Sequence, residues 1–529
     1  MQGFVGLWKH RVVLRGTTRS KCGPQVGRML RISPRLMSMV DETRISRLND
    51  DDVRANGKYV LYWMQESVRS RYNHALEYAV ERANEIKVPL VAVYGVDESF
   101  PETNVRHKAF LLEGLAEAQK NLSRRGIRLL IVKHPPKETV GKLQKDAACV
   151  VVDRGYVRIV REWRRDVAEA STCAVFQVET DVVVPVEVAS KKEETAARTI
   201  RKKIESQLAT YLKKVEEVPL DHASPENVDL HGLQLLDIGN IESALASLSL
   251  DCSVWRVKTF LGGEDQALEQ LQLFLDTRLK HYGKRNEPSV DITSNMSPYL
   301  HYGNISPIEI ALKVRPLRKK YPDEVKSFLE ELIVRRELAM NLVFYNDAYD
   351  SFDVIPNYAK ITLMEHADDK RPYLYTEEQL ERAKTHDIYW NAAQAEMVLT
   401  GKMHTYMRMY WGKKILEWTS GPREAFDIAL RLNNKYNIDG RDPNSFTGIA
   451  WCFGKHDQGW AEREIFGKVR YMNSAGLERK FDMKGYVNRI NKIREGHEGW
   501  ENPPALLQYF NKRSADLNGS SKPSKRRNK

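Results

Sequence analysis

YVLYWM, at residues 59–64, is a run of β-branched, aromatic and aliphatic residues that predicts a buried β-strand. Further strand-like runs occupy residues 89–96, 128–134, 149–153 and 174–178. Amphipathic stretches separate them, such as residues 107–125, which Gly126 can cap. Strands and helices that alternate at this spacing predict a parallel sheet with right-handed crossovers. We therefore expect a doubly wound α/β domain over residues 56–185.

The texture of the sequence changes after this domain. Residues 186–265 hold a charged, helix-forming piece and a stretch with few structural signals, so we expect an interdomain connector. From residue 266 to 510 the pattern is helical with little period-two alternation, which predicts an all-α domain. The expected fold class is α/β plus all-α. No GxGxxG motif follows a predicted strand, so the ordinary dinucleotide-binding fingerprint is missing.

Composition excludes several classes of protein. No run approaches the eighteen or so apolar residues that a membrane span needs. The five cysteines are scattered singly, and the sequence has neither a CxxC pair nor an HExxH motif. We therefore expect no metal site and no disulfide framework.

The net charge of +12 lies at the two ends of the chain. Residues 1–40 hold eight Lys or Arg and no acid, and residues 511–529 hold seven with one acid, which leaves residues 41–510 slightly acidic. We expect residues 1–50 to be a basic N-terminal extension, either an organelle transit peptide or a disordered arm. Residues 511–529 are expected to be a disordered basic tail, and KPSKRRNK at 522–529 is typical of a nuclear-localisation patch. Nucleus is thus the expected location, with mitochondrion or chloroplast as a further one.

Tryptophan is concentrated in the helical half. A large aromatic core is the simplest explanation for any one of these residues. The stretch KMHTYMRMYWGKKILEW, residues 402–418, argues for more, because a single face of this predicted helix carries His404 and Arg408 together with Trp411 and Trp418. A buried guanidinium needs a partner or an anion, so a polar group is expected against this face. Six of the ten tryptophans are in this half: Trp390, Trp411, Trp418, Trp451, Trp460 and Trp500.

The segments WNAAQAEMVLTGKMHTYMRMYWGKKILEW (390–418) and LNNKYNIDGRDPNSFTGIAW (432–451) resemble the class II cyclobutane pyrimidine dimer photolyases. The similarity extends through HDQGWAEREIFGKVRYMNSAG (456–476), SNMSPYLHYGNIS (294–306) and VLYWMQESVRSRYNHAL (60–76), and spans roughly residues 56–490. Members of this family hold FAD inside the helical domain. They pass one photoexcited electron from reduced flavin to a dimer in UV-damaged DNA, and the electron returns after the ring opens.

The resemblance implies a cofactor site. Tyr282 and the run Thr293, Ser294, Asn295, Met296 and Ser297 match the segment that cradles the FAD phosphates. Arg408 and Asp439 match the pair beside the isoalloxazine, and Asn433 matches the residue near flavin N5. The N-terminal domain of relatives can hold an antenna chromophore, whose identity and presence here no residue decides.

The resemblance also implies a lesion site for a pyrimidine dimer flipped out of the duplex. Glu331 matches the acid that hydrogen-bonds the base edge, although a charged helix surface is the simpler interpretation of EELIVRRE. Met409, Trp451 and Trp460 match the walls that receive the dimer, since stacking compensates for unstacking. Arg285 and Asn286 match residues that fill the hole left in the duplex.

A third set of matches concerns photoreduction of oxidised flavin. Trp411, Trp390 and Trp418 match the proximal, middle and distal members of the electron path, and Tyr406 and Tyr410 are expected to flank it. The sequence departs from some relatives at Arg335, where they carry Trp, and in a Trp451–Trp460 spacing one residue shorter. These departures fall on the expected dimer pocket.

The sequence favours a monomeric, membrane-independent repair enzyme. The main alternative is a blue-light receptor of the cryptochrome type, which shares the architecture. Such receptors usually signal through a long C-terminal extension, whereas about 20 residues follow Phe510. Repair of (6-4) photoproducts is a third alternative, but the His pair expected for it is not evident.

Overall fold

The computed structural model describes residues 39–495. The expected transit segment up to residue 38, the tail at 511–529 and Trp500 lie outside the described residues. Within the described part, no helix is both long and apolar enough to span a bilayer.

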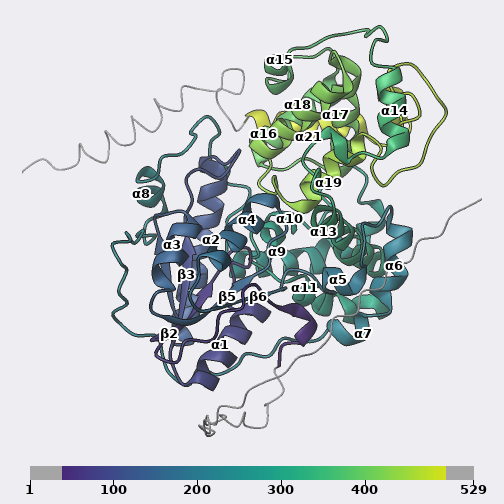
Figure 1. Ribbon diagram of the computed structural model, residues 1–529. Helices are drawn as coiled ribbons and strands as arrows, with labels where there is room; N and C mark the ends of the chain where they lie inside the picture. Colours follow the sequence, from purple (N-terminus) through teal and green to yellow (C-terminus); the bar gives the residue numbers. More distant parts are fainter. Residues whose placement is uncertain (1–38, 496–529) are drawn as a thin grey trace, which may run out of the picture. The chain divides into compact units, whose positions relative to one another are not determined.

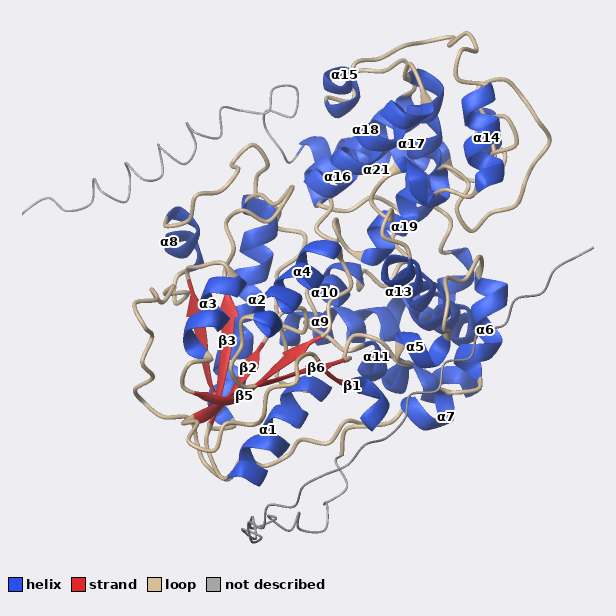
Figure 2. Cartoon of the chain, viewed as in Figure 1, coloured by secondary structure: helices blue, strands red, loops and turns tan. Residues whose placement is uncertain are grey.

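The N-terminal part of the described chain is built around a six-stranded sheet, drawn red in Figure 2. The strand order is β1-β6-β5-β2-β3-β4, and all neighbouring pairs are parallel except β1 with β6. The chain enters the middle of the sheet at β2, proceeds to β4 and returns to β5, so the winding reverses between β2 and β5. The strands are β1 (Ile45–Arg47), β2 (Tyr59–Trp63), β3 (Leu90–Gly95), β4 (Arg128–Val132), β5 (Ala147–Asp153) and β6 (Ala174–Val178).

Helices cover both faces of this sheet, as Figure 1 shows. Val60 and Tyr62 point to one face, where they share a core with α1 (His74–Ile86) and α2 (Val105–Arg124). Leu61 and Trp63 point to the other, against α3 (Pro136–Leu143) and α4 (Arg158–Glu169). Because successive side chains of a strand alternate, a sheet buried on both faces needs the continuous apolar run seen at 59–64. The doubly wound α/β domain is confirmed.

The first strand is the part of the sheet that the sequence did not reveal. β1 and the short helix η1 (Glu42–Arg44) lie inside the stretch predicted to be a basic extension up to residue 50, so that boundary was wrong. Arg44 is buried and donates to the carbonyls of Glu179 and Val182. A three-residue edge strand is too short for an alternation pattern, and its antiparallel pairing depends on β6, more than 120 residues away.

The predicted connector packs largely on its neighbours. Leu235 bridges to Val132 at the edge strand β4, and Leu233 joins the core under α3 and α4. Its helices are α5 (Val186–Ala189), α6 (Ala197–Glu205), α7 (Leu208–Tyr211) and α8 (Ile241–Ala246).

The rest of the described chain is helical, as expected. Two helices carry π-type turns: η2 (Phe274–Arg278) follows α9 (Glu264–Leu273), and η5 (Glu330–Arg335) joins α12 (Pro322–Leu329) to α13 (Arg336–Tyr345). The remaining elements are η3 (Leu279–Lys284), α10 (Ser297–His301), α11 (Pro307–Val314), η4 (Arg315–Lys319), η6 (Phe352–Val354), α14 (Asn357–Glu365), α15 (Glu377–Glu381), α16 (Ile388–Thr400), α17 (Thr405–Trp418), α18 (Pro422–Tyr436), α19 (Pro443–Cys452), α20 (Ser474–Glu478) and α21 (Met483–Glu495).

The helix predicted for residues 402–418 begins three residues later, at Thr405. His404 caps it instead, because its Nδ1 accepts a hydrogen bond from the Tyr406 N–H at 3.3 Å. This frees Lys402 from the helix, and its ammonium reaches another part of the candidate site.

Candidate active site

Three tryptophans form a continuous line through the helical core. Trp390 on α16 stacks on Trp411 of α17, with 6.2 Å between ring centroids and 8° between planes. Trp390 also meets Trp418 edge to face, with centroids 5.8 Å apart. Each of the three is at most 1% exposed, and the Trp411 indole donates to Gln394 Oε1 at 2.9 Å. Trp390 therefore bridges two tryptophans that lie two turns apart on α17, in the order that the sequence predicted.

Trp418 is buried, and further aromatic rings continue the line outward from it. Tyr375 and His386 lie 5.5 and 5.1 Å from Trp418 between centroids. The Tyr375 hydroxyl and His386 Nδ1 are 2.7 Å apart, and Tyr373 stacks on His386 at 3.7 Å. Tyr373 is 49% exposed, so this contact chain reaches the surface. Sequence reasoning missed these residues, because they sit in a loop without periodicity.

The two tyrosines predicted to flank the line have different surroundings. Tyr410 is buried, and its hydroxyl donates to the Asp387 carboxylate, which also caps α16 by accepting from the Trp390 N–H. Burial, followed by the charge of Asp387, raises the pKa of Tyr410. Tyr406 instead packs against Phe481 at 4.6 Å and accepts a hydrogen bond from Lys480. Tyr410 thus lies beside the line at the start of α16, and Tyr406 makes its contacts elsewhere.

Arg408 and Asp439 come together as predicted, but incompletely. Arg408 Nη2 lies 3.6 Å from Asp439 Oδ1, an ion pair that is longer than a hydrogen bond. Arg408 Nε and Asp439 Oδ1 are both shielded from solvent without a hydrogen-bond partner within the protein. An unsatisfied buried polar atom costs about 1–3 kcal/mol, so this pair is built to meet a further polar group.

Asn433 is fully buried between α18 and α19. Its Nδ2 donates to Ser445 Oγ at 2.5 Å, and its Oδ1 accepts from Asn437 Nδ2 at 2.9 Å. The neighbouring Asn437 Oδ1 is left without a partner. The amide acceptor available to a ligand in this arrangement is therefore that of Asn437, one turn further along than the predicted Asn433.

Residues 293–297 form a polar turn that Lys402 approaches. Thr293 Oγ1 donates to Asn295 Oδ1 at 2.9 Å, and Asn295 adopts a left-handed backbone conformation with φ of 58°. Lys402 Nζ donates to Thr293 Oγ1 at 3.3 Å and to Asn295 Oδ1. Burial lowers the pKa of Lys402. This cation, which the sequence did not single out, supplies a positive charge where the predicted phosphate cradle lies.

The other members of the predicted cradle sit around this turn. Ser294 accepts at its carbonyl from Gln270, while Met296 is buried and precedes Ser297, the first residue of α10. Tyr282 makes other contacts: its ring packs against Phe274 and Phe328, and the Arg285 guanidinium lies over it.

Glu331 and Arg285 are brought together by the π-type turn η5. Arg285 Nη2 lies 3.2 Å from Glu331 Oε1, and both side chains remain partly exposed. Asn286 next to Arg285 is exposed. Single π-type turns redirect side chains and are frequent at functional sites. Glu331 is therefore a partly exposed helix residue that also pairs with a predicted DNA contact 46 residues away in the chain.

The three predicted wall residues make different contacts. Arg335 stands over the Trp451 ring, with its guanidinium carbon 5.2 Å from the centroid. Met409 Sδ lies 3.9 Å from Cys452 Sγ, next to Trp451 in the sequence. Trp460 is 43% exposed and carries Arg470 over its ring at 4.5 Å. A large exposed indole held in place by a cation suits a stacking partner that arrives from solution.

The loop that carries Trp460 is anchored by His366. His366 Nδ1 faces Asp369 Oδ2 at 2.5 Å, and its Nε2 faces Glu462 Oε1 at 3.2 Å. Asp369 also accepts from the Ile465 N–H at 2.7 Å. The hydrogen bond with Asp369, followed by that with Glu462, raises the pKa of His366. Lys468 contributes a longer contact to Glu462, at 3.8 Å.

This anchor predicts a pH-dependent loop. Because the folded-state pKa of His366 is raised, its hydrogen bonds stabilise the loop fully below the ordinary value of 6.5. This stabilisation is lost as the pH rises through the folded-state pKa. We expect affinity for a dimer-containing oligonucleotide to fall by roughly twofold to fivefold over that rise, and His366→Asn to remove the dependence. Fluorescence titrations across the range measure this, with exposed His222→Asn as the control. A His366→Asn protein with an unchanged pH profile would contradict the anchor.

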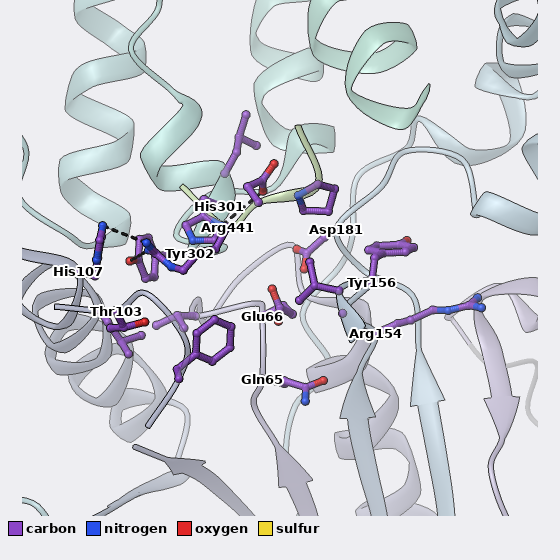
Figure 3. A pocket seen from close by; sticks show the side chains of 18 of the residues that line it. Gln65, Glu66, Thr103, His107, Arg154, Tyr156, Asp181, His301, Tyr302 and Arg441 are labelled. Atoms are coloured by element: carbon purple, nitrogen blue, oxygen red, sulfur yellow. Dashed lines mark hydrogen bonds and ion pairs between the residues drawn. The ribbon is translucent and has the colours of Figure 1, made fainter. Parts of the chain in front are cut away.

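A cavity lies where the winding of the sheet reverses (Figure 3). Gln65 and Glu66, which follow β2, and Arg154, which follows β5, line one side of it. His301 and Arg441 from the helical half line another. Burial, followed by the carboxylates of Asp181 and Asp153, raises the pKa of Glu66 to about 8. The carboxyl ends of parallel strands at a reversal are the usual ligand position in such sheets.

Comparison with known proteins agrees with this architecture. Residues 60–222 match the family model described as DNA photolyase. The chain is 50% identical over 462 residues to the deoxyribodipyrimidine photo-lyase of Methanothermobacter thermautotrophicus, which covers 86% of this chain and all of the relative. It is 39% identical to the deoxyribodipyrimidine photo-lyase of Potorous tridactylus, over 87% of each protein.

Solved structures with the same fold share much less sequence. A Synechocystis cryptochrome superposes with a TM-score of 0.65 at 18% identity, over 82% of this chain and 88% of that one. An archaeal photolyase from Sulfolobus tokodaii, described with two FAD molecules, superposes with a TM-score of 0.61 at 15% identity, over 87% and 99%. The sheet domain, the helical half with its tryptophan line and the identity to curated relatives place this chain in the DNA photolyase family.

Proposed function

We propose that the protein is a light-driven lyase of the class II type that splits cyclobutane pyrimidine dimers in UV-damaged DNA. The observation that carries this proposal is the pairing, within one helical half, of a buried tryptophan line with a partly exposed acid–arginine and indole site. The first suits electron supply to a buried cofactor. The second suits a flipped pyrimidine dimer that must be stacked and hydrogen-bonded.

The residues between these two sites fit FAD. The unsatisfied Arg408 Nε, Asp439 Oδ1 and Asn437 Oδ1 offer one donor and two acceptors to a polar ring system. Lys402 with Thr293 and Asn295 would hold the anionic phosphates. When bound and reduced, FAD supplies the photoexcited electron for dimer splitting and accepts it back.

The chain's own residues have separate tasks toward the DNA. Glu331 accepts hydrogen bonds from the base edge of the dimer, and Trp451, Met409 and Trp460 stack on it from the walls. Arg285 and Asn286 enter the gap in the duplex. Because Arg285 and Glu331 contact each other here, DNA binding must either keep or exchange that ion pair. Arg335 over Trp451 occupies a place where some relatives carry an aromatic wall.

Glu331→Gln should weaken recognition of the lesion more than binding of intact DNA. Hydrogen bonds to charged groups are worth about 1.5–3 kcal/mol, so we expect a tenfold to hundredfold loss in repair efficiency. Glu324→Gln on α12 is the matched control, because that side chain is only partly buried and has no assigned task. Equal repair efficiency of Glu331→Gln and the control, measured by counting dimers per light dose, would remove Glu331 from the lesion site.

The alternative functions differ in what light does to DNA. A cryptochrome-type receptor would absorb through the same cofactor without lowering the number of lesions, and a (6-4) enzyme would remove a different photoproduct. Curated relatives that are 39–50% identical are named deoxyribodipyrimidine photo-lyases, whereas a (6-4) photolyase and a DASH cryptochrome from Arabidopsis thaliana are each 24% identical.

A lesion count after illumination separates these functions. UV-irradiated DNA is incubated with flavin-loaded protein in blue light or darkness, and both photoproducts are quantified by mass spectrometry. We expect the number of cyclobutane dimers to decline only in the illuminated sample with protein, while (6-4) products persist. Dimers that survive illumination would exclude the lyase, and loss of (6-4) products alone would select the other repair activity.

The cavity at the sheet reversal is the position that we propose for an antenna chromophore. Its lining combines aromatic side chains such as Tyr156 and Tyr302 with ionisable side chains such as Glu66 and Arg154, which suits a planar polar molecule. Absorbance of the protein beyond the flavin bands, lost in a Glu66→Leu variant that retains flavin, would support this position. Full retention of those bands would contradict it.

We also propose a monomer that acts in the nucleus, with mitochondrion or chloroplast as a second location set by the basic N-terminal segment. The basic tails are the observation behind this proposal. Imaging of tagged full-length and Met39-start forms tests it, and identical nuclear patterns would remove the organelle location.

A further inference from the structure

The segment that precedes and opens α2 contacts the end of α18 through consecutive residues. Asn104 Nδ2 donates to the Lys435 carbonyl at 2.8 Å, and Arg106 Nη1 donates to the Tyr436 carbonyl at 2.6 Å. His107 Nε2 lies 3.1 Å from the carbonyl of the next residue, Asn437. We call residues 102–107 the α2 latch. It belongs to the sheet domain, and these three carbonyls belong to the helical half.

Arg106 makes the largest share of these contacts. Its side chain is 1% exposed, and its fork also donates to the Val398 and Met397 carbonyls at the end of α16, at 2.6 and 3.3 Å. Its Nε donates to the Trp255 carbonyl at 3.0 Å. These four acceptors are all backbone carbonyls, and burial lowers the pKa of Arg106 to about 9. A cation at the C-terminal end of a helix donates hydrogen bonds to the unpaired carbonyls and interacts favourably with the negative end of the helix dipole.

The two helices that Arg106 joins carry opposite sides of the candidate cofactor site. α16 bears Trp390 and Gln394, the partners of Trp411 in the electron line. α18 bears Asn433, whose amide is hydrogen-bonded to Asn437 immediately beyond the latch contact. Asp439, the partner of Arg408, follows two residues later. A shift of either helix end would move these groups relative to one another.

We propose that Arg106 is a positioning residue for the flavin site. Through this residue the sheet domain helps to hold the helices that surround the cofactor. The proposal rests on the proposed function. Arg441 lies at the same junction, with its Nη1 3.1 Å from His107 Nε2 (Figure 3), and it donates to the Asn434 carbonyl at 2.7 Å.

The test separates positioning from simple stability. Arg106→Lys keeps the charge but cannot reach two helix ends with one planar fork, and Arg106→Gln removes the charge as well. Arg125→Gln is the matched control. Arg125 caps the C-terminal end of α2 and is largely buried, but its partners Glu77, Ser70 and Val218 lie away from the cofactor site.

Three quantities are measured on flavin-loaded protein: the rate of FAD release, the midpoint potential of bound flavin and the thermal midpoint. We expect both Arg106 variants to release FAD roughly tenfold faster and to shift the midpoint potential, because the groups that α16 and α18 hold beside the flavin would move. Arg125→Gln should lower the thermal midpoint while leaving release and potential unchanged. Arg106 variants that match the wild type in release and potential would overturn the positioning role.

Other outcomes of the experiment are also informative. If both Arg106 variants fail to fold, Asn104→Ala removes one latch contact and should accelerate FAD release by a smaller factor, with no acceleration counting against the proposal. Equal changes of release in Arg125→Gln would also overturn it, because they would follow from stability alone. A wild-type protein that never binds FAD would overturn the proposed function itself, whereas flavin-tight variants of a flavin-loaded wild type contradict only the latch.

Discussion

Trp411→Phe is expected to abolish most photoreduction of oxidised flavin while repair by chemically reduced protein persists. A phenyl ring is much harder to oxidise than an indole, and each 1.4 kcal/mol added to a barrier slows the step tenfold, so we expect a loss of roughly 100-fold. The stacked geometry of Trp411 on Trp390 leaves no second indole to replace it along this line. The rate of absorbance loss at the oxidised flavin band under blue light measures the effect.

The control is the same substitution at a tryptophan that lies outside the line. Trp163 on α4 belongs to the sheet domain, so Trp163→Phe should photoreduce at the wild-type rate. Lost repair by chemically reduced Trp411→Phe would contradict its role as an electron relay. Undiminished photoreduction would contradict the order of the line. Tyr375→Phe provides a graded comparison, because Tyr375 follows the buried Trp418 toward the surface.

Asp439→Asn is expected to produce the second large effect, a loss of FAD. The carboxylate is the ion-pair partner of Arg408, and neutralising it leaves a cation with a shielded, unsatisfied Nε. Losing a charged hydrogen-bond partner costs about 1.5–3 kcal/mol, so the dissociation constant for FAD should rise by tenfold to hundredfold. Equilibrium dialysis against free FAD measures the constant.

Asp427→Asn is the matched control for this change, since Asp427 is exposed on α18 and has no assigned task. Its FAD affinity should equal that of the wild type. A thermal midpoint that falls in Asp439→Asn while FAD affinity stays constant would assign the Arg408–Asp439 pair to structure alone.

Local sequence patterns were sufficient for the sheet domain. The run at 59–64 corresponds to β2, and 174–178 is β6 with the same bounds, because strands buried on both faces consist of continuous apolar residues. β1 escaped prediction because its three residues form a strand only through pairing with β6. The helix at 405–418 was predicted from its apolar face, but its start depends on the His404 cap.

The sequence predicted the candidate site where the chemistry of a residue required a partner. Arg408 required a buried partner, and Asp439 is beside it. The pairing of Arg285 with Glu331 was beyond reach, because a π-type turn redirects Glu331 and no periodicity announces it. Lys402 and Arg106 were missed for the same reason: each acts through contacts with segments about 100 or more residues away, and surface lysines and arginines of similar appearance are common.

The tryptophan-rich half as a whole is expected to support light-dependent splitting of a pyrimidine dimer. An oligonucleotide with one thymine cyclobutane dimer is mixed without oxygen with flavin-reduced protein, given a light pulse and analysed by chromatography. We predict restored thymines in the illuminated sample, none in darkness, and oxidised flavin no more abundant afterwards than before. Intact dimers after illumination, or dimer loss matched by flavin oxidation, would contradict the claim that this protein splits dimers by lending and recovering one electron.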